Sequence, residues 1–171
     1  MSAAPSLPAL EPLPAIDLPA AQALAPQALL ERGRQRGRQA QLDYAGSLYP
    51  TEAWALVEAG AAQLIDVRTA EELKYVGRVP NSQHVAWQTG PAMIKNPRFL
   101  RELQGKSQPD QALVLLCRSG KRSAAAASAA AAAGFSQVFN VLEGFEGDLD
   151  QYQQRGDNGG WRLRGLPWLQ D

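Results

Sequence analysis

The chain has 171 residues, 45% hydrophobic and 20% charged, a mixture that suits one globular domain with a buried core. Lys and Arg number 17, as do Asp and Glu, so the net charge gives no reason to expect a nucleic-acid or membrane partner. The single cysteine excludes an internal disulfide, one cysteine with one histidine excludes the usual zinc sites, and no apolar run is long enough to span a membrane.

The N-terminal region is rich in proline. Six of the 12 prolines fall within residues 1–26, a density that favours extended, solvated chain over regular helix. We therefore predict a mostly disordered arm over residues 1–26, followed by a short helical lead-in over residues 27–43. Two glycines interrupt the basic part of the lead-in, so a solvated segment is favoured there over a patch for an anionic partner. Its four basic residues are Arg32, Arg34, Arg36 and Arg38.

From residue 44 onward, short apolar strands are expected to alternate with helices. Pro50 suits the first turn of a helix, where its missing N–H is harmless, and Gly60 is expected to end that helix. Residues 63–67 are short and apolar enough to form a buried strand.

The next stretch is predicted to start a second helix and then cross to another strand. Thr69 and Glu72 form a capping box, in which the hydroxyl and the carboxylate satisfy the first free amides of a helix. Residues 77–82 are rich in turn formers, and residues 84–86 are expected to form a short strand. Pro97 is predicted to open a further helix.

Two strongly apolar segments indicate the centre of a sheet. Residues 112–116 and 138–142 are apolar enough for central parallel strands. Between them, residues 124–133 are alanine except for one serine, which predicts a helix that stops at Gly134. The alternation predicts one α/β domain over residues 44–171 with a mostly parallel sheet.

One loop, which contains the single cysteine, has the residues expected of a reactive site. The strand ends at Leu116, Cys117 follows, and the next helix is expected to begin near Ser123. Ligand sites in open α/β sheets lie at the carboxyl ends of strands. Gly120 permits a turn that aims several N–H groups at one point, and the helix N-terminus adds positive potential. Together with the cations at 118, 121 and 122, these features favour the thiolate and would stabilise a persulfide anion. The alternative is an inert, buried cysteine.

At this point the sequence resembles the rhodanese homology domain, in its single-domain form. The similarity extends from Tyr44 to Trp168 and rests on motifs in a fixed order. They are Ile65–Arg68 (the family's Asp-Val-Arg element), Gly77–Ser82 (its Gly-His-Ile-Pro-Gly-Ala turn), Cys117–Ser123 (its active-site loop), Val141–Gly144, and the closing pair Gly160–Trp161 and Gly165–Trp168.

The resemblance implies a three-layer α/β/α fold with a mostly parallel central sheet of about five strands. It also implies a sulfurtransferase in which Cys117 takes sulfur from a small anionic donor such as thiosulfate. Cyanide or a thiol, on a small molecule or a protein, would then accept the sulfur, and no cofactor is needed. Asp66 and Arg68 are assigned a structural role near the site. The residues expected to bind substrate and persulfide are Arg118, Ser119, Gly120, Lys121, Arg122 and Ser123.

The sequence departs from the family pattern at three positions. Arg78 and Asn81 replace the usual His and Gly of the turn, far from the chemistry. Phe145 replaces a frequent second glycine, and it is expected either to pack in the core or to line the pocket.

Two other functions are weighed against sulfur transfer. A phosphatase or arsenate reductase would place five residues between its cysteine and arginine, whereas Arg122 comes one residue too early and Ser123 stands at that position. A sulfur carrier or an idle interaction module for a partner protein is the other alternative, since a fold does not fix function. The N-terminus lacks a secretory signal, so we expect a cytoplasmic protein.

Overall fold

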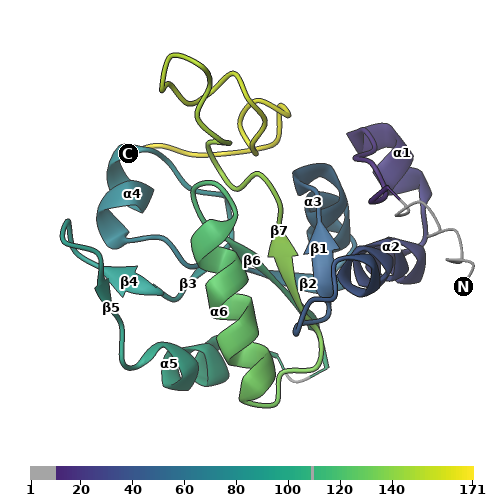
Figure 1. Cartoon of the computed structure of the whole chain (residues 1–171), viewed down its shortest axis with the longest axis horizontal. Coiled ribbons are helices and arrows are strands. Elements are labelled where there is room, and N and C mark those ends of the chain that lie inside the picture. The colour runs from purple at the N-terminus through teal and green to yellow at the C-terminus, as the bar shows by residue number, and fades with distance from the viewer. Residues whose placement is uncertain (1–10, 109) are drawn as a thin grey trace, which may run out of the picture.

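The computed structural model describes residues 11–108 and 110–171. At its centre is a five-stranded parallel sheet with the strand order β1-β7-β6-β2-β3 (Figure 1). The predicted α/β fold with a mostly parallel sheet of about five strands is confirmed. The strands are β1 (Gly46–Leu48), β2 (Ala62–Asp66), β3 (Gln83–His84), β6 (Ala112–Leu116) and β7 (Val138–Val141).

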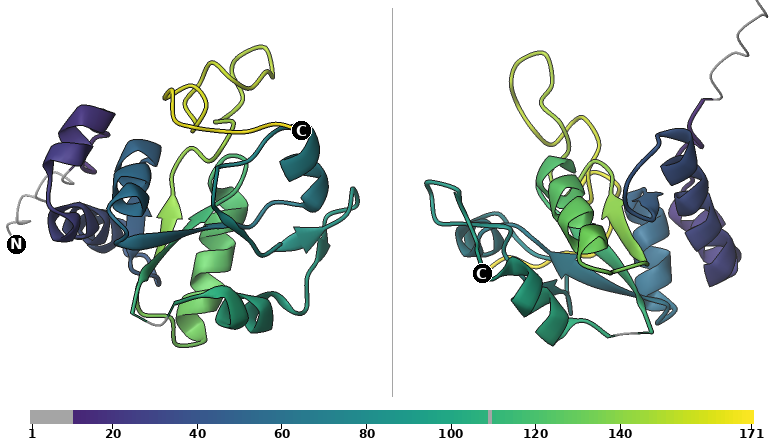
Figure 2. Two further views of the ribbon diagram at one scale, coloured as in Figure 1. Left: turned by 180° about the vertical axis from the view of Figure 1, so that it is seen from behind. Right: turned by 60° about the horizontal axis from the view of Figure 1, so that its bottom comes forward.

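Helices cover both faces of this sheet, as the two views in Figure 2 show. One face carries α1 (Leu18–Ala23), α2 (Pro26–Gln39) and α3 (Pro50–Glu58). The other carries α5 (Phe99–Lys106) and α6 (Lys121–Ala132). No helix within the described residues is both long and apolar enough to cross a membrane. The remaining elements are α4 (Ala70–Tyr75) and an antiparallel pair, β4 (Gln88–Thr89) and β5 (Ile94–Lys95).

The central strand β6 divides its side chains between two hydrophobic cores. All five of its residues are buried. Val114 and Leu116 face the core under α1, α2 and α3, whereas Leu113 and Leu115 face the core under α5 and α6. Successive side chains of a strand point to opposite faces, so Cys117 continues the second set and lies on the α6 side.

The local signals predicted several elements closely. The strand at 112–116 matches β6 residue for residue. Both helix-ending glycines are left-handed, Gly60 at φ 69° and Gly134 at φ 103°. The capping box is formed, because the Thr69 hydroxyl accepts from the Glu72 N–H and the Glu72 carboxylate accepts from the Thr69 N–H.

Strand β1 was not predicted, because it is short and its role depends on a helix that lies over it. A Cβ atom at Gly46 would stand 1.9 Å from the carbonyl oxygen of Gly33 in α2. A Cβ atom at Gly37 would stand 2.7 Å from the carbonyl oxygen of Ala45. The glycines of α2 therefore serve a close approach of helix and strand, and do not mark a weak, solvated helix.

The expectation of a mostly disordered arm over residues 1–26 is wrong for its described part. Helix α1 forms because Pro19 lies in its first turn and the Asp17 carboxylate caps it, accepting from the Ala20 N–H at 2.8 Å. Ala21 is fully buried in the core shared with α3. Residues 1–10 of the predicted arm lie outside the described residues.

The solvated-segment interpretation of the arginines is wrong for Arg36. This side chain is buried and pairs with Glu52, with Nη1 2.7 Å from Oε1 and Nη2 3.0 Å from Oε2. Arg32 adds a 2.7 Å bond to the same carboxylate. Glu52 is fully buried and needs such partners, so these two arginines fasten α2 to α3.

Candidate active site

The candidate site lies at the carboxyl edge of the sheet, where β6 gives way to α6 (Figure 1). Cys117 follows the last residue of the strand, and three loop residues separate it from Lys121, the first residue of the helix. Gly120 adopts φ 96° as the N-cap of α6, a left-handed conformation that favours glycine. The predicted tight turn from strand to helix is therefore formed at Gly120.

Two hydrogen-bond donors converge on the sulfur of Cys117. The Gly120 N–H lies 3.1 Å from Sγ, and the Ser123 Oγ also lies 3.1 Å from it. Cys117 is only 1% exposed, so both donors act in a nearly water-free environment. The structure thus brings together Cys117, Gly120 and Ser123 of the predicted site, with one amide on Sγ in place of the wider ring of amides expected.

Sequence reasoning missed Asn140, the residue that completes this cluster. Its Oδ1 lies 2.5 Å from the Ser123 Oγ, and its Nδ2 donates to the Gly120 carbonyl oxygen at 3.1 Å. Asn140 is 97% buried on β7. A polar residue inside an otherwise apolar central strand was the available signal, since a buried amide requires partners.

The three loop cations differ in their surroundings. Arg118 and Lys121 are exposed, and neither forms an ion pair within the described residues. Arg122 instead turns to Glu72 of α4 and binds both carboxylate oxygens, at 2.8 and 2.7 Å. Much of the Arg122 charge is therefore already matched, whereas Arg118 and Lys121 present theirs to solvent.

The Glu72–Arg122 pair also changes the ionisation of both partners. Burial disfavours the charged carboxylate, but the bonds from Arg122 and Thr69 outweigh it and lower the pKa of Glu72 to about 2. The same pair raises the pKa of Arg122, although burial opposes this. The pair joins the N-terminus of α6 to α4.

Asp66 and Arg68 lie on the opposite face of the sheet from the sulfur. Their neighbours Ile65 and Val67 point into the core under α6, so Asp66 and Arg68 point the other way. Both are fully buried, with Arg68 Nη2 2.7 Å from Asp66 Oδ2. Arg68 also donates to the Gly77 carbonyl oxygen and stacks over the Phe145 ring at 4.2 Å. These contacts are consistent with a structural role near the site.

The segment after β7 supports the loop from behind. The Phe145 N–H donates to the Cys117 carbonyl oxygen at 2.8 Å, and the Glu146 N–H donates to that of Arg118 at 2.9 Å. Gly144 lies so close that a Cβ atom there would stand 2.4 Å from the Arg118 carbonyl carbon. The Phe145 side chain is fully buried in the core with Trp161, so it packs and does not line a pocket.

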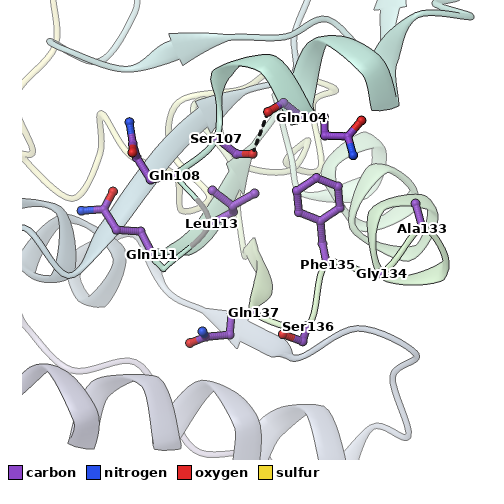
Figure 3. Close-up of a pocket in the computed structure, with 10 residues that line it drawn as sticks. All are labelled: Gln104, Ser107, Gln108, Gln111, Leu113, Ala133, Gly134, Phe135, Ser136 and Gln137. Atoms are coloured by element: carbon purple, nitrogen blue, oxygen red, sulfur yellow. Dashed lines mark hydrogen bonds between the residues drawn. The ribbon is translucent and has the colours of Figure 1, made fainter.

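A cavity of about 320 Å³ lies at the other end of α6 (Figure 3). It is lined by Gln111 just before β6, by Leu113 of β6, and by Gly134 and Phe135 after the end of α6. Neutral polar side chains dominate its wall, and it is separate from the Cys117 loop. Across the described ranges, no group of three or more His, Cys, Asp or Glu residues is placed to hold a metal ion.

Comparison with known proteins assigns the family. The profile of the rhodanese-like domain matches residues 49–150. An uncharacterized protein of Rickettsia prowazekii, RP600, is 37% identical over 111 residues, covering 63% of this chain and 82% of that protein. The thiosulfate sulfurtransferase GlpE of Pseudomonas savastanoi is 33% identical over 97 residues, covering 57% of this chain and 80% of that protein.

A solved structure has a similar fold and sequence. The crystal structure of Rv0390 from M. tuberculosis superposes with a TM-score of 0.68 at 40% identity, covering 75% of this chain and 99% of that one. The fold and the Cys117 loop define an α/β domain with a cysteine at the carboxyl edge of its sheet. The chain belongs to the rhodanese-like domain family.

Proposed function

We propose that this protein is a sulfurtransferase that carries sulfur as a persulfide on Cys117. The observation that carries the proposal is the convergence of the Gly120 N–H and the Ser123 hydroxyl on Sγ, each at 3.1 Å, at the start of α6. A helix N-terminus and directed donors favour negative charge, and a sulfur nucleophile must be an anion. The named activity of GlpE, a relative at 33% identity, adds support.

The transfer takes place in two displacements that balance in atoms and charge. The Cys117 thiolate attacks the outer sulfur of thiosulfate, a new S–S bond forms, and sulfite leaves with the electron pair of the broken bond. Cyanide or a thiolate then attacks the outer sulfur of the persulfide, and the Cys117 thiolate leaves. Together the two steps replace one difficult transfer with two easier ones, which is the advantage of covalent catalysis.

The loop offers distinct groups for the inner sulfur, the outer sulfur and the donor. Gly120 and Ser123 hold the inner sulfur. The amides of residues 121–123 begin α6 and therefore have no acceptor within the helix, which suits them to the outer sulfur. The exposed side chains of Arg118 and Lys121 are placed to attract an anionic donor, whereas Arg122 shares its charge with Glu72.

Intact-mass measurement after thiosulfate treatment tests the proposal. The chain has one cysteine, so any added sulfur is assigned without ambiguity. We expect the wild type to gain one sulfur atom and to lose it when cyanide is added. The Cys117→Ala variant should remain unmodified. A wild type that stays unmodified, with sulfite absent from the solution, would refute sulfur transfer and favour a non-catalytic interaction module.

A further inference from the structure

The single hydroxyl hydrogen of Ser123 has two acceptors within reach. Its oxygen lies 3.1 Å from the Cys117 sulfur and 2.5 Å from Oδ1 of Asn140. A serine has one O–H, so only one of the two acceptors can receive the hydrogen at any moment. Oxygen is the stronger acceptor and here the nearer one, so the amide holds the hydrogen while the sulfur is a neutral thiol.

The orientation of the Asn140 amide is fixed by its other contact. Nδ2 donates to the Gly120 carbonyl oxygen at 3.1 Å, which an oxygen atom in that place could not do. Oδ1 must therefore face Ser123. Gly120 closes the ring, because its own N–H donates to the sulfur. The four residues form one buried cycle of hydrogen bonds, in which the Ser123 hydrogen has two acceptors within reach.

The two ionisation states of the sulfur place opposite demands on this hydrogen. A neutral thiol can donate its own hydrogen to the Ser123 oxygen, and the Ser123 hydrogen then stays on Asn140. A thiolate can only accept, so Ser123 must turn its hydrogen to the sulfur and leave Oδ1 without it. Oδ1 is buried, and loss of its partner makes the thiolate harder to form.

We propose that Asn140 is a positioning residue that competes with the Cys117 sulfur for the Ser123 hydrogen and so restrains ionisation of the resting cysteine. This inference rests on the proposed use of Cys117 as a sulfur nucleophile, but it concerns the protein before any sulfur donor has reacted with it.

The charged and titratable groups around the cycle come from every element packed against it. Burial raises the pKa of Tyr44, which packs beside this core, although its hydrogen bonds with Ser47 and Asn140 oppose the rise. Replacing Ser123 or Asn140 removes none of these charges. The groups are Arg118, Lys121 and Arg122 of the loop and α6, Glu72 of α4, Tyr44 before β1, and, across the sheet, Asp66 of β2 with its partner Arg68.

The test is a pH titration of the thiolate by its ultraviolet absorbance, with Cys117→Ala in each background as the blank. Because the chain has one cysteine, the difference signal reports Cys117 alone and requires no sulfur donor. We expect Ser123→Ala to raise the midpoint and Asn140→Ala to lower it, each by roughly half a pH unit, or about threefold in the ionisation constant. The double variant should behave like Ser123→Ala, since Asn140 acts through Ser123.

A merely structural Asn140 gives a different pattern. Loosening of the loop would raise the midpoint or leave it unchanged in Asn140→Ala, and either result overturns the proposal. So does a double variant whose midpoint lies below that of Ser123→Ala. Should Asn140→Ala not fold, Asn140→Leu provides the same comparison, because leucine keeps the approximate shape of the side chain. Near-ultraviolet circular dichroism checks that each variant is folded. Sulfur loading is measured separately, so failure of the proposed transfer would leave the titration result intact.

Discussion

The ion pair between Glu72 and Arg122 is expected to stabilise the fold above about pH 4.5 and to lose its effect as the pH falls toward 2. The pKa of Glu72 is lowered from 4.5 to about 2, so the unfolded chain binds a proton more readily than the native one in this window. Stability from this group is thus complete above 4.5 and is lost as Glu72 becomes protonated in the native state.

The size of this stabilisation follows from how far the pKa of Glu72 is lowered. At about 1.4 kcal/mol per pH unit the lowered pKa corresponds to at most about 3.4 kcal/mol, and partial exposure of the pair reduces this to roughly 1–2 kcal/mol. We therefore expect Glu72→Gln to lower the free energy of unfolding by that amount near pH 7. The deficit relative to wild type should shrink by about half near pH 3.

Urea unfolding of both proteins at the two pH values measures this difference. The matched control is Glu71→Gln, because Glu71 is the preceding residue of α4, is exposed, and forms no ion pair within the described residues. It should change stability by less than about 0.5 kcal/mol at either pH. A Glu72→Gln deficit that is the same at both pH values, or that Glu71→Gln reproduces, would refute the electrostatic reasoning.

Two further changes test the backing of the loop and the role of its cations. Gly144→Ala should cost about 2–4 kcal/mol and slow persulfide formation, because φ is 65° and the new Cβ would meet the Arg118 carbonyl carbon at 2.4 Å. Gly165→Ala, at φ 72° with open space around it, is the control, and an equal cost in urea unfolding would contradict the clash. Lys121→Ala should raise the KM for thiosulfate severalfold at low salt, with the difference from wild type fading as salt is added. A KM that Lys121→Ala leaves unchanged at low salt would show that this cation does not bind the donor.

Local sequence signals were enough for the elements that depend on nearby residues. Strand β6, the turn at Gly120 and the capping box of Thr69 and Glu72 each arise from residues within one element or one turn. Apolar run length, a glycine that tolerates positive φ and a side chain that caps its own helix are all encoded over a few positions. The position of Cys117 at the end of a buried strand followed from the same signals.

Tertiary structure alone decided which distant residues meet. Glu72 and Arg122 are 50 positions apart, Ser123 and Asn140 are 17 apart, and Arg36 and Glu52 are 16 apart. Each pair is joined only after crossovers bring separate elements together, so hydrophobic periodicity and turn signals carry no information about them. Parallel pairing sets β7 beside β6 and puts Asn140 within reach of the loop, and a buried amide there has to bond whatever the fold presents. The sequence by itself therefore determined the position of Cys117 and its turn, whereas the residues that surround them were decided by the packing of β7, α4 and α6.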